Sequence, residues 1–160
     1  MAAPVGGGDS VDWGTIRADY GWQFPNDYKE FVAVYGMGSI GDSLFISTPP
    51  FSEYPYASHL LSETPYPPPG GLLCWGTNEG GDDFLWRCAD ADPEQWTIVI
   101  RTRDQTLHEY DMGIGEFLLN VISGNLVIPL TASLEIDPPV FETWREEDLR
   151  MKEEGELEGF

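Results

Sequence analysis

Four short apolar segments follow one another between residues 72 and 112, and turn residues separate each pair. The segments read LLCWG, DFLWRC, WTIVIRT and LHEYDM. Apolar and aromatic runs of this length, bounded by Gly, Asn and Asp, are typical of strands joined by tight connections. This succession predicts an antiparallel meander, which a chain of 160 residues can bury against helices as one domain.

Helical patterns lie on both sides of this meander. In FPNDYKEFVAVYGMG, Pro25 suits a first helical position, apolar residues recur from Tyr28 to Tyr35 at helical spacing, and Gly36 supplies the stop. Further helices are predicted from Ser10 to about residue 19, over about 112–123 after an Asp111 cap, and over about 140–154. With a further strand over 39–47, the expected fold class is α+β, an antiparallel sheet of four to five strands with N- and C-terminal helices packed on it.

The expected domain organisation follows from composition. Residues 1–9, rich in Gly and Ala, are predicted to be a disordered tail. Residues 10–138 are predicted to form a single domain with a Pro/Tyr-rich insertion at 48–71. Residues 139–160 are predicted to form an acidic C-terminal helix and tail. A connection as long as the insertion is often functional, although it can also simply wrap the surface.

The charge of the chain is extreme for its size. It carries 28 acidic against 8 basic residues, a net charge of −20. Such a field repels phosphate backbones and anionic membranes, so we expect no nucleic-acid and no membrane partner, while it attracts basic proteins. Solubility alone is the alternative explanation. The first ten residues lack the features of a secretory signal, and two cysteines make no disulfide framework, so we expect a cytoplasmic protein with reduced thiols.

Catalytic and ligand-binding motifs are mostly excluded by their context. GMGSIG at 36–41 follows a helix and precedes a strand, the reverse of a dinucleotide site. DADPE at 90–94 lacks the glycine and the glutamate of a calcium-binding EF-hand. His59 and His108 have no zinc spacing with each other or with Cys74 and Cys88, which lie in apolar segments typical of inert thiols. We therefore expect no catalytic residues, no metal and no cofactor.

The segment WGTNEGGDDFLWRC at 75–88 combines a turn with many carboxylates. Asn78-Glu79-Gly80-Gly81 favours a hairpin turn that brings Trp75 within diagonal reach of Trp86 or Phe84, and, for a turn at 80–82, Cys74 near Cys88. From Glu79 to Glu94 the chain has six acids and one Arg. We take as candidate partner-binding residues the acids of this region with tryptophans as anchors: Glu79, Asp82, Asp83, Asp90, Asp92, Glu94, Trp22, Trp75, Trp86 and Trp96. For each, a solvated surface carboxylate or a core tryptophan is the plain alternative.

Several of these motifs occur together in one family. They are Trp13-x-x-Ile16, Tyr20-Gly21, Pro25-Asn26-Asp27-Tyr28-Lys29-Glu30-Phe31, Tyr35-Gly36-x-Gly38-x-Ile40, Leu44-x-Ile46 before Pro49, Gly80-Gly81-Asp82-Asp83-Phe84 and Glu116-Phe117-Leu118. With them the chain resembles the SUKH superfamily, specifically its Smi/Knr-like branch of fungal cell-wall-synthesis regulators and small bacterial proteins. The resemblance implies an α+β fold and no shared catalytic residues. In bacteria it implies an immunity protein that neutralises a toxin domain, often a nuclease.

Three functions follow as expectations. The leading one is a non-enzymatic protein-binding domain of the immunity type, whose partner is a basic toxin domain. The alternative is a regulatory or scaffold domain that binds a host protein, as the fungal relatives suggest. The third is a hydrolase built on the turn carboxylates Glu79, Asp82 and Asp83.

Overall fold

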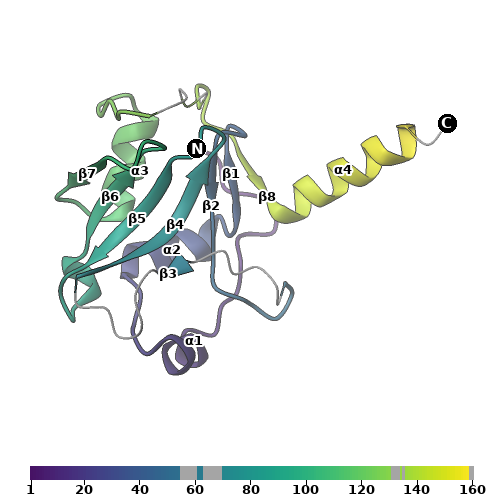
Figure 1. Cartoon of the computed structure of the whole chain (residues 1–160). Coiled ribbons are helices and arrows are strands. Elements are labelled where there is room, and N and C mark those ends of the chain that lie inside the picture. The colour runs from purple at the N-terminus through teal and green to yellow at the C-terminus, as the bar shows by residue number, and fades with distance from the viewer. Residues whose placement is uncertain (55–60, 63–69, 131–133, 135, 159–160) are drawn as a thin grey trace.

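An antiparallel sheet forms the centre of the computed structural model, which describes residues 1–54, 61–62, 70–130, 134 and 136–158 (Figure 1). Its strands are β1 (Gly38–Ile40), β2 (Leu44–Ile46), β3 (Leu61–Ser62), β4 (Gly71–Asn78), β5 (Asp83–Cys88), β6 (Thr97–Arg101), β7 (Leu107–Tyr110) and β8 (Phe141–Thr143). Seven of them follow the order β7-β6-β5-β4-β2-β1-β8, and β3 pairs with β4. The helices are α1 (Trp13–Tyr20), α2 (Asn26–Val34), α3 (Ile114–Ile122) and α4 (Trp144–Glu158), with a short 3-10 helix η1 (Pro93–Gln95). The expected α+β class is confirmed, with more strands than the four to five predicted.

The predicted meander is present as β4 to β7, each strand antiparallel to the next. A bulge between Cys74 and Gly76 turns Trp75 into the core, where its ring centroid lies 5.5 Å from that of Phe84 and 6.3 Å from that of Trp86. The predicted diagonal aromatic contact is therefore confirmed. The cysteines are not opposite each other, because Cys74 pairs with Leu85 and Cys88 with Gly71.

The strand predicted over 39–47 is instead a hairpin of β1 and β2. Gly41 and Asp42 adopt positive φ angles of 60° and 53°, which a tight turn requires and which Gly and Asp tolerate. The sequence also did not predict β8, which pairs with β1 across about a hundred residues of chain. It continues directly into α4, so the last helix begins at 144 rather than near 140.

Helices α1, α2 and α3 contribute to one core with the sheet. Ile16 of α1, Val32 of α2 and Phe117 of α3 belong to the same buried cluster as Trp86 of β5 and Ile98 of β6. Alternate strand residues point the other way: Cys74, Leu85 and Val99 form a separate small cluster. In contrast, α4 projects away from the body beyond its first turns (Figure 1).

The caps of α1 and α3 also differ from the expectation. The cap of α1 is Asp12 rather than Ser10, and its carboxylate accepts a hydrogen bond from the Thr15 amide at 3.1 Å. The cap position of α3 is Gly113, two residues after Asp111. A carboxylate from α2 meets the first turn of α3 instead. Asp27 Oδ2 accepts from the Gly115 amide at 3.0 Å, and a negative charge at this position is stabilised by the positive end of the helix dipole.

Part of the N-terminal segment that was expected to be disordered is attached to the domain. The amides of Gly8 and Asp9 donate to the carbonyls of Ala33 and Val32 at the end of α2. The Asp9 side chain is fully buried. Its carboxylate accepts from the Met37 amide at 2.7 Å and from Arg145 Nη1 at 3.0 Å. Sequence composition did not reveal this contact, because its partners are distant in the chain. The division into domains otherwise stays a prediction.

Most of the predicted insertion at 48–71, including His59, lies outside the described residues. Within the described part of the chain, no helix is both long and apolar enough to cross a membrane.

Candidate functional site

The six acids predicted to form one patch lie in two separate loops. Glu79, Asp82 and Asp83 are in or beside the β4–β5 turn, whereas Asp90, Asp92 and Glu94 lie between β5 and β6. The six residues of β5 separate the two loops, and at about 3.3 Å per residue this amounts to roughly 20 Å. The structure therefore does not bring the two groups together into one cluster.

Asp82 is an internal residue of the turn and is not presented at the surface. Its side chain is 0% exposed. One carboxylate oxygen accepts from Asn78 Nδ2 at 2.9 Å and the other from the Arg103 amide at 3.0 Å. The adjacent Asp83 forms an ion pair with Arg101 at 2.8 Å. The Asp82 carboxylate is thus used in hydrogen bonds within the domain. Among the three turn acids, Glu79 is the one exposed to solvent. These contacts also argue against the turn as a general acid–base pair.

The acids of the second loop are exposed but also have local structural roles. Asp92 caps η1 by accepting from the Glu94 amide at 3.0 Å. Glu94 reaches the start of α2, where its Oε1 accepts from the Asn26 amide at 2.7 Å. The indole of Trp96 donates to the Asp90 carbonyl at 2.8 Å. Glu94 therefore caps the start of α2, while the carboxylates of the loop remain exposed to solvent.

The four tryptophans proposed as anchors lie in the core. Their exposed fractions are 8% for Trp22, 0% for Trp75, 1% for Trp86 and 5% for Trp96. The ring of Trp86 contacts four other aromatic rings, those of Phe24, Tyr28, Trp75 and Trp96. This burial favours the plain alternative of core residues, and the role of the tryptophans as anchors for a partner stays a prediction.

The thiols are not arranged for nucleophilic catalysis. Burial raises the pKa of Cys74 to about 11 and that of Cys88 to about 12, so both remain protonated at neutral pH. Among the described residues, no group of three or more His, Cys, Asp and Glu side chains is placed to hold a metal ion.

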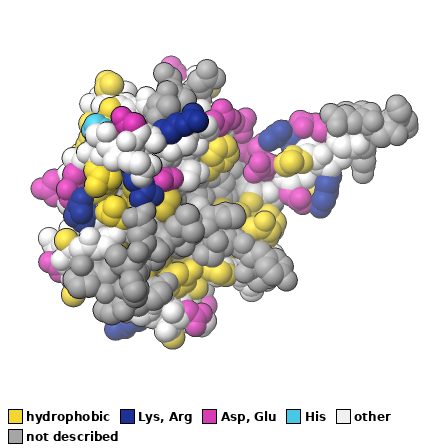
Figure 2. Space-filling model, in the orientation of Figure 1, with side chains coloured by type: hydrophobic (Ala, Val, Ile, Leu, Met, Phe, Trp, Pro, Cys, Tyr) yellow, Lys and Arg dark blue, Asp and Glu magenta, His cyan; other side chains and the backbone are white. Residues whose placement is uncertain are grey.

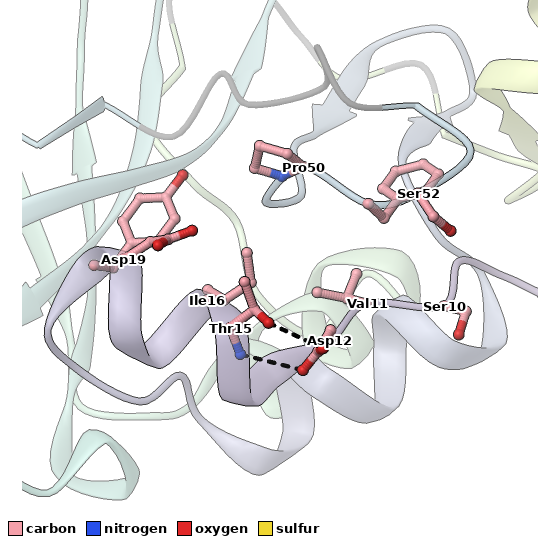
Figure 3. A pocket seen from close by; sticks show the side chains of 10 residues that line it. Ser10, Val11, Asp12, Thr15, Ile16, Asp19, Pro50 and Ser52 are labelled. Atoms are coloured by element: carbon pink, nitrogen blue, oxygen red, sulfur yellow. Dashed lines mark hydrogen bonds between the residues drawn. The ribbon is translucent and has the colours of Figure 1, made fainter.

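A cavity that the sequence did not indicate lies between α1 and the segment 50–52, with a volume of about 850 Å³ (Figure 3). Its described apolar lining includes Val11, Ile16 and Phe51, and two carboxylates, those of Asp12 and Asp19, also belong to the lining. No Lys, Arg or His is among its described lining residues. The described lining therefore combines an apolar surface with two negative charges.

The two carboxylates of this cavity differ in how firmly they are held. Asp12 accepts from both the amide and the hydroxyl of Thr15, at 3.1 and 3.0 Å. These hydrogen bonds lower the pKa of its carboxyl group, so it is ionised at neutral pH. Asp19 lies almost two turns later on the same helix and is exposed. We call Asp12, Asp19 and the apolar lining of Val11, Ile16 and Phe51 the α1 pocket.

Sequence reasoning could have found only part of the α1 pocket. Its second wall is the beginning of the Pro/Tyr-rich insertion, which the sequence marks as a possible specificity element. Nothing in the sequence, however, indicates that residues 50–52 lie opposite α1, more than thirty positions away.

The comparisons with known proteins identify the chain by family. No curated protein and no solved structure matches it significantly. The SUKH_6 family model, described as SMI1-KNR4 cell-wall, matches residues 12–118, which contain α1, α2, the meander and the first half of α3. This match covers about two thirds of the chain, so the protein belongs to the SUKH_6 family of the SUKH superfamily that its motifs resemble.

Proposed function

We propose that this protein is a non-enzymatic binding domain of the immunity type, which binds and neutralises a basic toxin domain. The observation that carries the proposal is the α1 pocket, where two carboxylates accompany an apolar lining with no described cationic side chain. A lysine or arginine fits this combination, since its aliphatic stem packs on apolar surface while its charged end meets a carboxylate.

The charge of the whole molecule supports the same kind of partner. With a net charge of −20, the protein attracts a basic surface of the kind that a nuclease needs to hold phosphates. Electrostatic steering of this kind raises association rate constants to about 10⁸–10⁹ M⁻¹s⁻¹ at low salt. Figure 2 shows acidic side chains distributed over the visible face of the body and along α4.

The proposed electrostatic steering includes the exposed acids of the two loops. Glu79 at the β4–β5 turn and Asp90, Asp92 and Glu94 before β6 lie in separate places, and each contributes to the association rate more than to affinity. Asp83 belongs with them as a half-exposed carboxylate already paired with Arg101. Asp82 and the four tryptophans have no part in it, because they are buried.

The test is to capture the partner and then remove the pocket charges. The tagged protein is incubated with extract of its native cells at low salt, and proteins released at high salt are identified by mass spectrometry. The variant Asp12→Asn/Asp19→Asn keeps the α1 cap, because Asn caps helices as well as Asp. The control Glu30→Gln/Asp111→Asn removes the same charge from two exposed sites outside the pocket.

We expect a small basic toxin domain in the wild-type and control eluates, and at least tenfold less of it with the pocket variant. The toxin's activity, assayed on its own substrate, should be inhibited by the wild-type protein and spared by the pocket variant. Equal capture by the pocket variant would remove the α1 pocket from the proposal. Salt-released partners that are not toxins would contradict the immunity function.

The second candidate function is regulation of a host protein. It is favoured by the description of the matching family model, SMI1-KNR4 cell-wall. The same experiment separates the two candidates, because a cell-envelope or housekeeping protein captured through the same pocket supports regulation.

A further inference from the structure

A second cavity lies where α4 leaves the body, between this helix and the strands β1, β2 and β4. Its volume is about 520 Å³. Its lining includes the motif residues Gly38 and Ile46 and side chains of the predicted acidic C-terminal helix. We call it the α4 groove, and the residues on which the argument depends are Met37, Phe45, Trp144, Glu147, Asp148 and Met151.

The helical wall of this groove is positioned by several contacts at its base. Trp144 stacks on Tyr54, with ring centroids 4.5 Å apart and planes inclined by 26°. Thr143 and Glu146 form a capping box: the Glu146 amide donates to Thr143 Oγ1 at 3.2 Å, and the Thr143 amide donates to Glu146 Oε2 at 3.1 Å. Arg145 holds the buried Asp9. The first turns of α4 are thus fixed to the domain.

One stripe of α4 faces the groove. Trp144, Glu147, Asp148 and Met151 follow the spacing i, i+3, i+4 and i+7, which places them on one face of the helix. Seven residues at 1.5 Å each make this stripe about 10 Å long, or two helical turns. The groove therefore offers a linear contact surface long enough for two turns of a partner helix.

The chemistry of the groove is apolar with a negative wall. Met37 and Phe45 on the sheet side are half-buried, and Met151 on α4 is 59% exposed. Methionine adapts its shape to different partners and is common on binding surfaces. Glu147 forms no ion pair within the described part of the chain, whereas Asp148 is paired with the exposed Lys152 of the next turn at 2.7 Å. The described groove lining contains no Lys, Arg or His.

We propose that the α4 groove binds a basic amphipathic helix of a partner protein. A large apolar side chain of that helix packs on Met37, Phe45 and Met151, and a Lys or Arg one turn away meets Glu147 and Asp148. Charge complementarity favours this occupant, because a molecule with a net charge of −20 repels a second copy of itself and any acidic segment. The inference rests on the proposed preference for a basic partner and adds a second contact surface to it.

The four methionines of the chain allow a direct test by NMR. With ¹³C-methyl methionine, Met37 and Met151 report on the groove, while Met1 and Met112 lie outside its described lining. The probe is a 14-residue helical peptide of Leu and Lys with Leu on one face. One control peptide has Ser in place of Leu, and the other has Glu in place of Lys.

We expect saturable shifts of the Met37 and Met151 methyl signals with the Leu/Lys peptide and none at Met112. Both control peptides should bind at least tenfold more weakly. If the Ser/Lys peptide bound with the same affinity as the Leu/Lys peptide, the contact would be nonspecific charge attraction and the proposal would be wrong. Saturation without a shift of Met37 and Met151, or no saturation, would overturn the proposal.

Matched variants on α4 separate local charge from total charge. We expect Glu147→Gln/Asp148→Asn to weaken peptide binding roughly tenfold, and Glu153→Gln/Glu154→Gln, outside the described groove lining, by less than twofold. The pocket variant Asp12→Asn/Asp19→Asn should leave the methyl shifts unchanged. Partner capture without methyl shifts would contradict the groove alone, and methyl shifts without capture of any basic protein would contradict the proposed function alone.

Discussion

The β4–β5 turn and the first turns of α4 are both rich in carboxylates, but the structure uses them differently. In the turn, Asp82 and Asp83 are bonded to groups of the same domain, the Asn78 amide group, the Arg103 backbone and Arg101. On α4, Glu147 and Asp148 line a groove, and Asp148 pairs with the exposed Lys152 of the same helix. The comparison shows that the density of acidic residues in a sequence does not reveal which are available to a partner.

Loss of the buried turn carboxylate should have the largest effect. We expect Asp82→Ala to lower the free energy of unfolding by about 3 kcal/mol, because the Arg103 amide and Asn78 Nδ2 each lose a charged acceptor. Urea denaturation followed by tryptophan fluorescence measures this change. A loss below about 1 kcal/mol would mean that Asp82 is not a structural residue and would remove the contrast with α4.

The carboxylate that does hold α4 lies in the N-terminal segment. We expect Asp9→Ala to cost about 2 kcal/mol, since the Met37 amide loses its acceptor while Arg145, 37% exposed, can be hydrated again. The same denaturation measurement applies. Asp9→Asn, which keeps an acceptor oxygen, should cost less than Asp9→Ala, and a larger loss for Asn would contradict this assignment.

Asp83 provides the matched neighbour of Asp82. We expect Asp83→Ala to lower the free energy of unfolding by about 0.5–1 kcal/mol, because its ion pair with Arg101 is partly exposed. The effect should diminish in 1 M NaCl, as expected for a screened pair. An effect as large as that of Asp82→Ala would show that the turn acids act as one unit.

The smallest effect is expected on α4. Glu147→Gln/Asp148→Asn should change the free energy of unfolding by less than about 0.5 kcal/mol, since the Asp148–Lys152 pair is an i,i+4 pair worth a few tenths. Circular dichroism would show whether helix content is retained. A loss above about 1 kcal/mol would mean that these acids stabilise the fold in the same way as those of the turn.

Local sequence patterns predicted the elements whose partners are nearby in the chain. The meander and α2 follow from spacing and turn residues, and the contact of Trp75 with Phe84 follows from the hairpin. The Gly41-Asp42 turn within the segment read as one strand was a usable local signal. β8 was missed because it pairs with β1, about a hundred residues away.

The candidate site was harder to predict than the fold. The acids at 79–94 lie close together in sequence, but an extended strand separates them into two groups in space. The α1 pocket and the α4 groove each arise where distant segments meet, 50–52 beside α1 and α4 beside β2. Such surfaces depend on tertiary contacts that a single sequence does not encode in a readable pattern.

The anchoring of α4 has a consequence for how the protein can vary. Asp9 lies before the family-matched region 12–118, and Trp144 and Arg145 lie after it, yet the Asp9 carboxylate accepts hydrogen bonds from both of these side chains. The two flanking segments therefore form one coupled accessory unit on a shared family scaffold. Among SUKH_6 proteins we therefore expect residues 9, 144 and 145 to vary together, and the α4 groove to be inherited or lost as a whole.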